Sequence, residues 1–318
     1  MPIVKTEYNP MAFLKYSAVN TTYASKLRRV EQIKYSRERF ELKDGDFIDV
    51  DWNFTGSRKL LVVMHGLGGH SGRTYVRGMI SLFRSFGYDS AAFNMRGCSG
   101  ETNRLISTYH SGRTQDLREV VAQIKKKKAY DTMVLAGFSL GGNLILKYLG
   151  EEGSKSQFSA AISVSAPIEL VSCSAKISSN EFYMNYFLKK LKPYLLQKRA
   201  LFPEISLEGF ENIKNFQQYD DRYTAPFNGF KNSMDYWKKA SALPYVHDIK
   251  TPTLLVNAHD DPVLSDECFP EKIALRHKFF HLASTDFGGH VGFVRFFSGN
   301  RYYHEKLAEE FILKYGLD

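Results

Sequence analysis

The chain has 318 residues, of which 43% are hydrophobic and 24% are charged. These proportions are ordinary for a soluble globular protein, and a core of this size needs no disulfide or metal ion for its stability. Three widely spaced cysteines, Cys98, Cys173 and Cys268, form no CxxC pair, which indicates reduced thiols in a reducing compartment.

The sequence shows no signal for secretion or membrane insertion. Residues 1–20 contain no basic segment followed by an apolar stretch of signal-peptide length. No run of 18 apolar residues occurs anywhere in the sequence, so no transmembrane helix is predicted. We therefore expect a cytoplasmic protein.

The net charge is +9, and its densest cluster is formed by the four lysines at 125–128. The cluster follows the helix-like segment LREVVAQI, and cations are favourable at a helix C-terminus, so we interpret it as a solvated helix end. The charge is also compatible with peripheral contact with an anionic membrane surface. Zinc-finger spacing and the interleaving of arginine with aromatic residues are both missing from the sequence, so no nucleic-acid partner is expected.

The predicted elements begin with an antiparallel hairpin at residues 36–53, whose turn contains the pair Asp44-Gly45. Further along, apolar runs of strand length alternate with helix-like segments. The runs lie at residues 59–66, 90–97, 132–139, 159–167, 251–260 and 278–285, and the clearest helix-like segments lie at 74–87 and 115–128. Most runs are continuously apolar, as in strands that are buried on both faces of a parallel sheet. The alternation predicts an α/β fold with a mostly parallel, doubly wound sheet flanked by helices.

One interval, residues 171–245, interrupts this alternation and contains no clear buried strand. Its segment 181–202 has aromatic residues and leucines at helical spacing, which we expect to be broken by Pro193. The interval is far longer than an ordinary crossover connection, so we predict a helical insertion between two strands of the sheet.

The segment GFSLGG (137–142) places a serine among glycines where an apolar run meets a helix-like stretch. A P-loop is excluded because Asn143 and Leu144 stand where lysine and a hydroxyl residue would hold phosphate and magnesium. Dinucleotide binding is excluded as well, because the segment lacks GxGxxG and the other glycine-rich turn has Ser71 in place of the last glycine. The segment does match the GxSxG nucleophile elbow, in which a strained turn exposes a serine, here Ser139, at the end of a strand.

A serine hydroxyl becomes a good nucleophile only when a base takes its proton, and His290 is the candidate base. It follows the last strand-like run, and the chain order serine, acid, histidine is that of nucleophile-elbow enzymes. The segment HDDPV offers Asp260 and Asp261 as the acid that orients the histidine. We prefer Asp261, since Pro262 fixes the loop directly after it, and we interpret Asp260 as a turn or capping residue. A metal site at this cluster is the weaker interpretation, because no second group of ligands stands nearby.

Two backbone amides are candidates for stabilising an oxyanion. The amide of Leu140 follows the serine at the start of the predicted helix. The turn HGLGGH after the first core strand is the expected second donor, with Leu67 as the residue involved. A plain glycine turn would not explain so many small or flexible positions in one loop.

Taken in order, the segments HGLGG, FNMRGCSGE, GFSLGGNLILKYLGE, YTAPFNGF, TPTLLVNAHDDPV and GGHVGFV resemble the α/β-hydrolase superfamily. The combination of RGC, TAPxxGF and GGHVGF is similar to its YheT-like carboxylesterase branch. The resemblance implies an α/β-hydrolase fold with Ser139 as nucleophile, His290 as base and Asp261 as acid. It also implies Leu67 and Leu140 as oxyanion donors. The sequence departs from the branch pattern near the N-terminus, where YSAVNTTYAS stands in place of a GHxQT-like motif.

Together these parts predict a serine hydrolase that cleaves carboxylic esters through an acyl-enzyme intermediate. The resemblance implies short- to medium-chain acyl esters, including lipid-derived ones, as the small-molecule substrates. No metal or organic cofactor is expected. An acyltransferase or thioesterase with the same triad is the alternative, because the sequence does not show whether water reaches the intermediate. A binding protein on this fold would have a degraded triad, which the sequence does not show.

The predicted organisation has three parts, and the oligomeric state is left open. Residues 1–45 form an N-terminal extension that packs on the core, and residues 46–170 and 246–318 form the α/β-hydrolase core. Residues 171–245 form a helical cap or lid. Six aromatic residues of this cap suit an apolar acyl chain, namely Phe182, Tyr183, Tyr186, Phe187, Tyr194 and Phe202.

Overall fold

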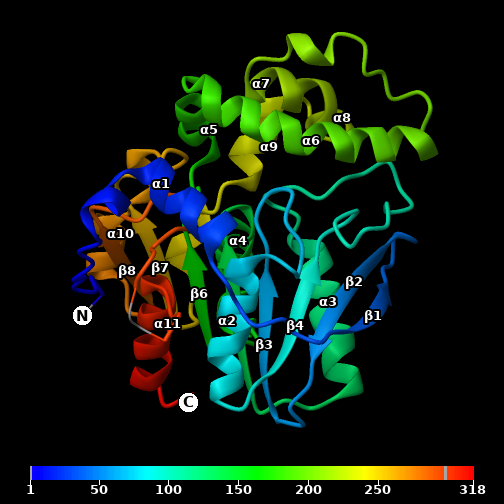
Figure 1. Cartoon of the computed structure of the whole chain (residues 1–318). Coiled ribbons are helices and arrows are strands. Elements are labelled where there is room, and N and C mark those ends of the chain that lie inside the picture. Colours follow the sequence, from blue (N-terminus) through cyan, green and yellow to red (C-terminus); the bar gives the residue numbers. More distant parts are fainter. Residues whose placement is uncertain (1, 297–298) are drawn as a thin grey trace.

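Eight strands form one sheet at the centre of the molecule (Figure 1), and the computed structural model describes residues 2–296 and 299–318. The strands are β1 (Ser36–Glu41), β2 (Phe47–Asn53), β3 (Lys59–Met64), β4 (Asp89–Asn94), β5 (Thr132–Phe138), β6 (Ala160–Val164), β7 (Thr253–Ala258) and β8 (Phe280–Thr285). Their order in the sheet is β1-β2-β4-β3-β5-β6-β7-β8. β2 is antiparallel to both of its neighbours, and all other neighbouring strands are parallel. Each predicted apolar run overlaps one of these strands, although β4 begins one residue before its run, and the prediction of a mostly parallel sheet is confirmed.

Burial explains why the sequence of the middle strands is continuously apolar. Every residue of β6 and β7 is buried, whereas β1 at the edge of the sheet buries only Phe40. Helices cover both faces of the middle strands, so neither face has to be polar. The predicted hairpin is confirmed as β1 and β2, and Gly45 in its turn has φ 86°, which glycine adopts without strain.

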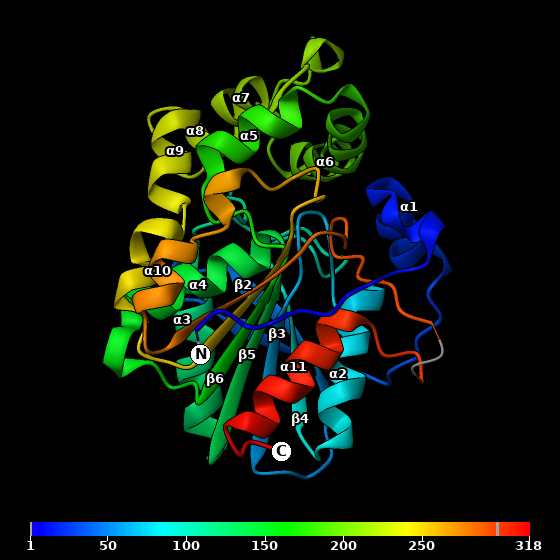
Figure 2. The same cartoon turned by 90° about the vertical axis from the view of Figure 1, so that its left-hand side faces the viewer.

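Helices lie on both faces of the sheet (Figure 2). α2 and α11 pack on one face, and α3, α4 and α10 pack on the other. Their bounds are α2 (Thr74–Ser85), α3 (Thr114–Lys127), α4 (Leu140–Glu152), α10 (Glu271–Arg276) and α11 (Tyr303–Lys314). Fully buried apolar side chains such as Phe83 of α2 and Leu117 of α3 face the sheet from its two sides. The core is therefore divided by the sheet into two apolar layers.

The lysine cluster at 125–128 lies at the C-terminal end of α3, as expected. Lys127 forms an ion pair with Glu38, and Lys128 forms one of 2.8 Å with Asp89. These pairs, together with the negative end of the helix dipole, account for the cluster within the fold.

Arg96, in the segment RGC after β4, connects this loop to α3 and to the hairpin turn. Its side chain is 1% exposed and makes two hydrogen bonds of 2.7 Å to Asp116. It also donates to Asp46 at 2.9 Å and to Asp44 at 2.8 Å. Loss of a partner would leave a buried charge uncompensated, so the network holds these loops in a fixed arrangement.

The N-terminal segment runs beside the core and reaches the carboxyl edge of the sheet (Figures 1 and 2). Ile3 forms an isolated bridge with Leu282 of β8. The chain then forms the short helices η1 (Ala12–Lys15), α1 (Ser17–Thr22) and η2 (Tyr23–Leu27). Leu14 and Ala24 pack in one cluster with Val294, so this segment contacts the loop that follows β8.

Five helices between β6 and β7 lie beyond the carboxyl edge of the sheet (Figure 1). They are α5 (Leu170–Ser178), α6 (Glu181–Leu201), α7 (Phe216–Tyr219), α8 (Ala225–Phe227) and α9 (Ser233–Ala240). The remaining short helical turns of the described chain are η3 (Gly153–Lys155), η4 (Phe210–Asn212), η5 (Asp220–Thr224), η6 (Leu243–Asp248) and η7 (Asp266–Cys268). The structure describes the whole interval 171–245 and assigns none of its residues to a strand, as the sequence predicts.

The prediction that Pro193 breaks the helical segment is wrong, because the proline lies inside α6, a continuous helix of 21 residues. A proline inside a helix costs about 3 kcal/mol, since it lacks the N–H and crowds the preceding turn. The leucines Leu188, Leu191 and Leu195 on α6 are buried. Each buried leucine contributes roughly 2 kcal/mol, so the packing of this helix offsets the cost of the proline.

Candidate active site

Ser139 stands between the end of β5 and the start of α4 in a left-handed backbone conformation. Its φ is 52° and its ψ is −120°, a region that residues with a side chain adopt only under strain. Glycines on both sides make this turn sterically feasible. A Cβ atom at Gly137 would lie 2.5 Å from the carbonyl oxygen of Gly141, and one at Gly141 would lie 2.5 Å from that of His65. The backbone therefore has the geometry of a nucleophile elbow.

The structure brings Ser139, His290 and Asp261 together in one hydrogen-bonded chain. Ser139 Oγ lies 2.9 Å from His290 Nε2, and His290 Nδ1 lies 2.9 Å from Oδ2 of Asp261. The aspartate side chain is 0% exposed, whereas the imidazole is 14% exposed. A carboxylate accepts a hydrogen bond from the protonated Nδ1, so Nε2 is left unprotonated and faces the hydroxyl group. This arrangement allows the histidine to accept the hydroxyl proton.

Asp260 has a different partner from Asp261. Its Oδ1 atom accepts a hydrogen bond of 2.8 Å from the amide of Gly289, the residue before the histidine. Asp261 also accepts a hydrogen bond of 2.8 Å from the amide of Val263 within its own loop. Asp260 therefore fixes the backbone of the histidine loop, and Asp261 faces the imidazole itself.

Two side chains of the N-terminal segment also hold the loop of His290, and sequence reasoning missed both. The amide of His290 donates to Thr21 Oγ1 at 2.9 Å, and the amide of Val294 donates to Asn20 Oδ1 at 3.0 Å. Asn20 is fully buried and donates in turn to the carbonyl oxygen of Leu14. Both residues belong to YSAVNTTYAS, the segment that departs from the branch pattern. Its position far from the other motifs gave no spacing that pointed to the site.

Leu67 and Leu140 line the same cavity as Ser139, and Leu140 directly follows the serine in the chain. A Cβ atom at Gly66 would lie 3.1 Å from Ser139 Cβ, so the loop before Leu67 adjoins the serine directly. Among the described residues, neither leucine amide donates a hydrogen bond to another protein group. Unpaired amides in this position suit the oxyanion of a tetrahedral intermediate.

Two tyrosine hydroxyls fix the loop that contains Leu67. The amide of Gly66 donates to Tyr75 OH at 3.2 Å, and the amide of Gly68 donates to Tyr109 OH at 2.9 Å. The amides on both sides of Leu67 are therefore occupied, and its own amide remains available. Sequence reasoning found the glycine loop and missed these tyrosines, which come from α2 and from the segment before α3.

His65 links the same loop to the loop after β4. Its Nδ1 lies 2.8 Å from the carbonyl oxygen of Gly66, and its Nε2 lies 3.1 Å from the amide of Met95. Burial lowers the pKa of His65 to about 4, so the ring is neutral near pH 7. A neutral ring that donates from Nδ1 and accepts at Nε2 satisfies both contacts.

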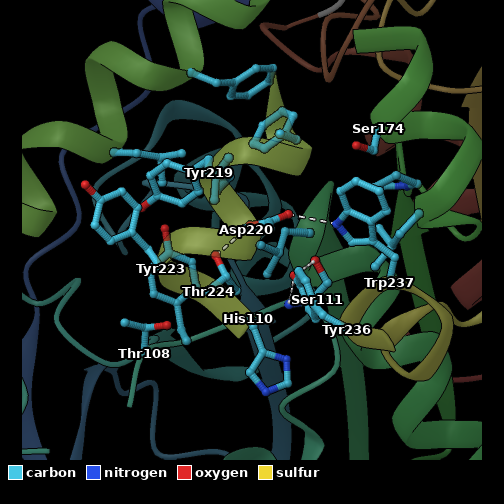
Figure 3. Close-up of a pocket in the computed structure, with 18 of the residues that line it drawn as sticks. Thr108, His110, Ser111, Ser174, Tyr219, Asp220, Tyr223, Thr224, Tyr236 and Trp237 are labelled. Atoms are coloured by element: carbon cyan, nitrogen blue, oxygen red, sulfur yellow. Dashed lines mark hydrogen bonds between the residues drawn. The ribbon is translucent and has the colours of Figure 1, made fainter. Parts of the chain in front are cut away.

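Ser139 lies at the junction of two cavities. The first has a volume of about 900 Å³, including its open mouth, and extends beneath the helices between β6 and β7 (Figure 3). Its apolar lining includes Ile177, Phe187, Leu191, Leu195, Phe216 and Phe227. The second cavity, of about 1130 Å³, lies between α6, the N-terminal helices and the start of α2.

The aromatic residues predicted for an acyl chain are divided between these cavities. The first cavity is lined by Phe187 and Tyr194. The second is lined by Tyr183, Tyr186 and, again, Phe187. Neither cavity is lined by Phe182 or Phe202. Phe182 is 70% exposed at the start of α6, and Phe202 packs against the core cluster. Helical spacing alone did not indicate which side chains face a cavity.

Asp220 places a carboxyl group in the otherwise apolar first cavity, and sequence reasoning missed it. Its two oxygens accept hydrogen bonds from Trp237 Nε1 at 2.8 Å and from Thr224 Oγ1 at 2.6 Å (Figure 3). Neither donor carries a charge, and burial raises the pKa of Asp220 to about 7. Thr224 begins the TAPxxGF motif, so the motif itself was the available signal for this residue.

The HDD cluster is accounted for by packing and by the contacts of its two aspartates. The ring of His259 stacks on Phe269 with centroids 4.1 Å apart. Among the described residues, no group of three or more histidine, cysteine, aspartate or glutamate side chains is placed to hold a metal ion. None of the helices in the described residues has the length and hydrophobicity needed to cross a membrane.

Comparison with known proteins identifies the family and the fold to which the chain belongs. A model of the family described as "Serine aminopeptidase, S33" matches residues 55–283, well over half of the chain. The esterase Pf2001 of Pyrococcus furiosus has a similar structure, with a TM-score of 0.61 and 19% identity over 90% of this chain and 98% of that chain. The esterase Est1E of Butyrivibrio proteoclasticus covers 89% of this chain and 99% of its own, with a TM-score of 0.55 and 16% identity. These structures support the fold.

Similarity to individual proteins shows to which branch of the superfamily the chain belongs. The chain is 32% identical to "Putative esterase YheT" of Escherichia coli (strain K12) over 91% of this chain and 87% of the relative. It is 29% identical to the monoacylglycerol lipase of Saccharomyces cerevisiae over 82% of this chain and 60% of the relative. It is 28% identical to the human phospholipase ABHD3 over 92% of this chain and 75% of the relative. The chain therefore belongs to the α/β-hydrolase superfamily, in the branch of YheT. The predicted enzyme class, a carboxylic ester hydrolase, is confirmed.

Replacement of Asp220 by asparagine tests the buried carboxyl group. Its pKa is about 7 in the folded protein and 3.8 when exposed, so between these values the folded state keeps a proton that the unfolded state has released. The stability that this proton gives is complete below pH 4 and is lost as the pH rises towards 7, by at most about 1.4 kcal/mol per pH unit. Asparagine mimics the neutral acid and does not titrate. We therefore expect the free energy of unfolding of D220N, relative to the wild type, to increase between pH 4 and pH 7 in urea titrations.

The matched control is Asp221→Asn at the neighbouring, exposed carboxylate, for which this increase should be much smaller. A difference between D220N and the wild type that stays constant with pH would show that Asp220 has no raised pKa.

Proposed function

We propose that the protein cleaves short- to medium-chain acyl esters with Ser139 as nucleophile, His290 as general base and acid, and Asp261 as the orienting acid. The observation that carries this proposal is the hydrogen-bonded chain of these three side chains beside two unpaired amides. The mechanism needs no metal ion or organic cofactor.

The reaction proceeds through an acyl-enzyme. His290 takes the proton of the Ser139 hydroxyl while Oγ attacks the ester carbonyl carbon. Asp261 keeps the imidazole oriented and stabilises its cationic form. The bond between the acyl carbon and the alcohol oxygen then breaks, and His290 returns its proton to the leaving oxygen. Water, activated by the same histidine, attacks the acyl carbon and restores the serine.

The oxyanion of both tetrahedral intermediates is stabilised by the amides of Leu67 and Leu140. Such donors are effective because they are already oriented before the charge develops, and one donor is worth about 3 kcal/mol of transition-state stabilisation. The contacts of Tyr75 and Tyr109 with the adjacent glycines support this role for Leu67, since they limit the movement of its loop.

Residues 171–245 act as a cap over the apolar cavity, which takes the acyl chain. The buried side chains of α5 and α6 that line this cavity support its use for an alkyl chain, because such a chain gains roughly 0.8 kcal/mol for each buried methylene group. The relatives named as a monoacylglycerol lipase and a phospholipase support lipid-derived esters as substrates.

Acyl transfer or thioester hydrolysis with the same triad is the alternative, because formation of the acyl-enzyme is common to all three reactions. A cytoplasmic location stays a prediction, supported by the sparse and odd set of three cysteines in the sequence. Peripheral contact with an anionic membrane also stays a prediction, and sedimentation with anionic and neutral liposomes at low and high salt tests it.

Hydrolysis of a p-nitrophenyl ester series from acetate to dodecanoate tests the proposed reaction. Ser139→Ala removes the nucleophile, so we expect kcat/KM to fall by at least about 10³-fold for every ester that the wild type cleaves. Added ethanol in the same assay separates hydrolysis from transfer, since transfer yields ethyl esters. Ser174→Ala, which removes a hydroxyl group elsewhere in the apolar cavity, is the matched control. Full activity of Ser139→Ala would exclude Ser139 as the nucleophile.

Enlargement of Leu191 tests the acyl cavity. Leu191→Trp fills part of the cavity from α6, so we expect the chain-length optimum to become shorter by at least about two carbons, since the lost methylene contacts reduce binding. Leu196→Trp on the same helix is the control, because Leu196 is 50% exposed and does not line the cavity. The same chain-length profile in both variants would place the acyl chain elsewhere.

A further inference from the structure

The two cavities at Ser139 provide space for the two halves of an ester. Both are lined by Leu67, Ser139, Phe187 and Val263, so they meet at the serine. An ester bound with its carbonyl carbon at Ser139 extends in two directions, with the acyl chain on one side and the alcohol on the other. In the proposed function the apolar cavity takes the acyl chain. The second cavity is then the space for the alcohol portion of the ester.

The two cavities have opposite charge character. The described lining of the second cavity includes Arg28, His70, Arg73 and Lys190 and contains no aspartate or glutamate. The described lining of the apolar cavity contains no lysine or arginine, and its one carboxyl group is Asp220. The positive charges are therefore confined to the side on which the alcohol would lie.

Not all of these basic groups are free to bind a ligand. Arg28 is paired with the buried Glu305 at 2.7 Å and also donates to the carbonyl oxygen of Asn300. Burial and the charge of Arg73 lower the pKa of His70, so its ring is largely neutral near pH 7. Two positive groups remain, Arg73 and Lys190. Within the described part of the chain, neither forms an ion pair with a carboxylate.

Arg73 and Lys190 both lie against Gly68, in the loop that holds the candidate oxyanion donor. Arg73 Nη2 donates to the carbonyl oxygen of Gly68 at 2.7 Å, and Lys190 Cβ would lie 3.5 Å from a Cβ atom at Gly68. Gly68 directly follows Leu67. Lys190 Nζ stands 4.2 Å above the ring of Tyr186, which orients the ammonium group in the cavity.

The two cations are unfavourable neighbours when nothing negative is bound. Lys190 is half-buried, and its pKa is lowered by burial and further by the charges of Arg73 and Lys26. An anion between the two side chains would relieve both the repulsion and the lost hydration. An arginine fork with a nearby ammonium group is a common arrangement for binding phosphate or carboxylate oxygens.

We propose that the second cavity binds the alcohol portion of an acyl ester whose alcohol carries an anionic group, a phosphate or a carboxylate, between Arg73 and Lys190. This inference rests on the proposed function. Ser139 Oγ forms a bond to the acyl carbon, the bond from that carbon to the alcohol oxygen breaks, and His290 protonates this oxygen. The anionic alcohol then leaves through the cationic cavity, while the acyl group stays in the apolar one.

A set of octanoyl esters that differ only in the alcohol tests the proposal, with kcat/KM measured below the micellar range. The set comprises 1-octanoylglycerol, 1-octanoylglycerol 3-phosphate, 3-octanoylglycerate and octanoylcholine. We expect the wild type to prefer the anionic esters to 1-octanoylglycerol by at least about tenfold and to disfavour the choline ester. Both the preference for the anionic esters and the discrimination against the choline ester should weaken as salt is added, whereas kcat/KM for 1-octanoylglycerol should not change. The order of the phosphate and carboxylate esters identifies which anion the cavity prefers.

Lys190→Gln provides the variant test, and its readout is the ratio of kcat/KM for an anionic ester to that for 1-octanoylglycerol. We expect this ratio to fall about tenfold in Lys190→Gln and further in Lys190→Glu. Lys189→Gln, at the adjacent exposed lysine that does not line the cavity, should keep the wild-type ratio. As an independent binding measurement, sn-glycerol 3-phosphate should inhibit the cleavage of 1-octanoylglycerol competitively, with a higher inhibition constant in Lys190→Gln.

Equal kcat/KM for anionic and neutral esters in the wild type, or a ratio that Lys190→Gln leaves unchanged, would overturn the proposal. Either result can be distinguished from failure of the proposed function by the cleavage of neutral esters. If Ser139-dependent cleavage of neutral p-nitrophenyl esters is present without any anionic preference, the reaction stands and only the anionic alcohol is excluded. If no ester is cleaved, the proposed function itself fails.

Discussion

The left-handed backbone at Ser139 is the constraint on which the geometry of the site depends. Such a conformation costs about 1–3 kcal/mol and persists only where the surrounding structure enforces it. Here β5 and α4 enter the turn from two sides, and Gly137 and Gly141 allow the backbones to approach within distances that any side chain would prevent. The same turn places the hydroxyl group beyond the end of the strand and the amide of Leu140 at the start of a helix. The candidate nucleophile and one candidate oxyanion donor are therefore positioned by a single backbone feature.

The two cavities beside Ser139 differ in polarity because different helices supply the side chains that line them. On one side, the helices between β6 and β7 contribute apolar side chains and Asp220, whose pKa burial raises to about 7. The start of α2 contributes Arg73 on the other side, and α6 contributes Lys190. Since α6 borders both cavities, we infer that its position relative to the sheet governs the space for both halves of a substrate. In the proposed function, the core thus supplies the chemistry, and the helices above it select among esters.

The sequence predicted those parts that depend on local pattern and missed those that depend on long-range contact. Continuous apolar runs identified the strands because strands covered on both faces need no polar side. Motif order identified Ser139 and His290 as members of one site. By contrast, Thr21 reaches the histidine loop across 269 residues of sequence, and no local pattern encodes that contact. Tyr109 was missed for the same reason. Pro193 misled the prediction, because its cost is local while the packing that offsets it is tertiary.

Whether Ser139 is an activated nucleophile is tested most directly by covalent labelling with a fluorophosphonate, followed by intact-mass and peptide mass spectrometry. The reagent phosphonylates a serine whose proton is taken by an adjacent base. We predict one adduct per chain on Ser139 and none in Ser139→Ala. In His290→Ala, labelling should be slower by at least about 10²-fold. An adduct on a different serine, or labelling at the same rate without the imidazole, would contradict the assignment of Ser139 and His290.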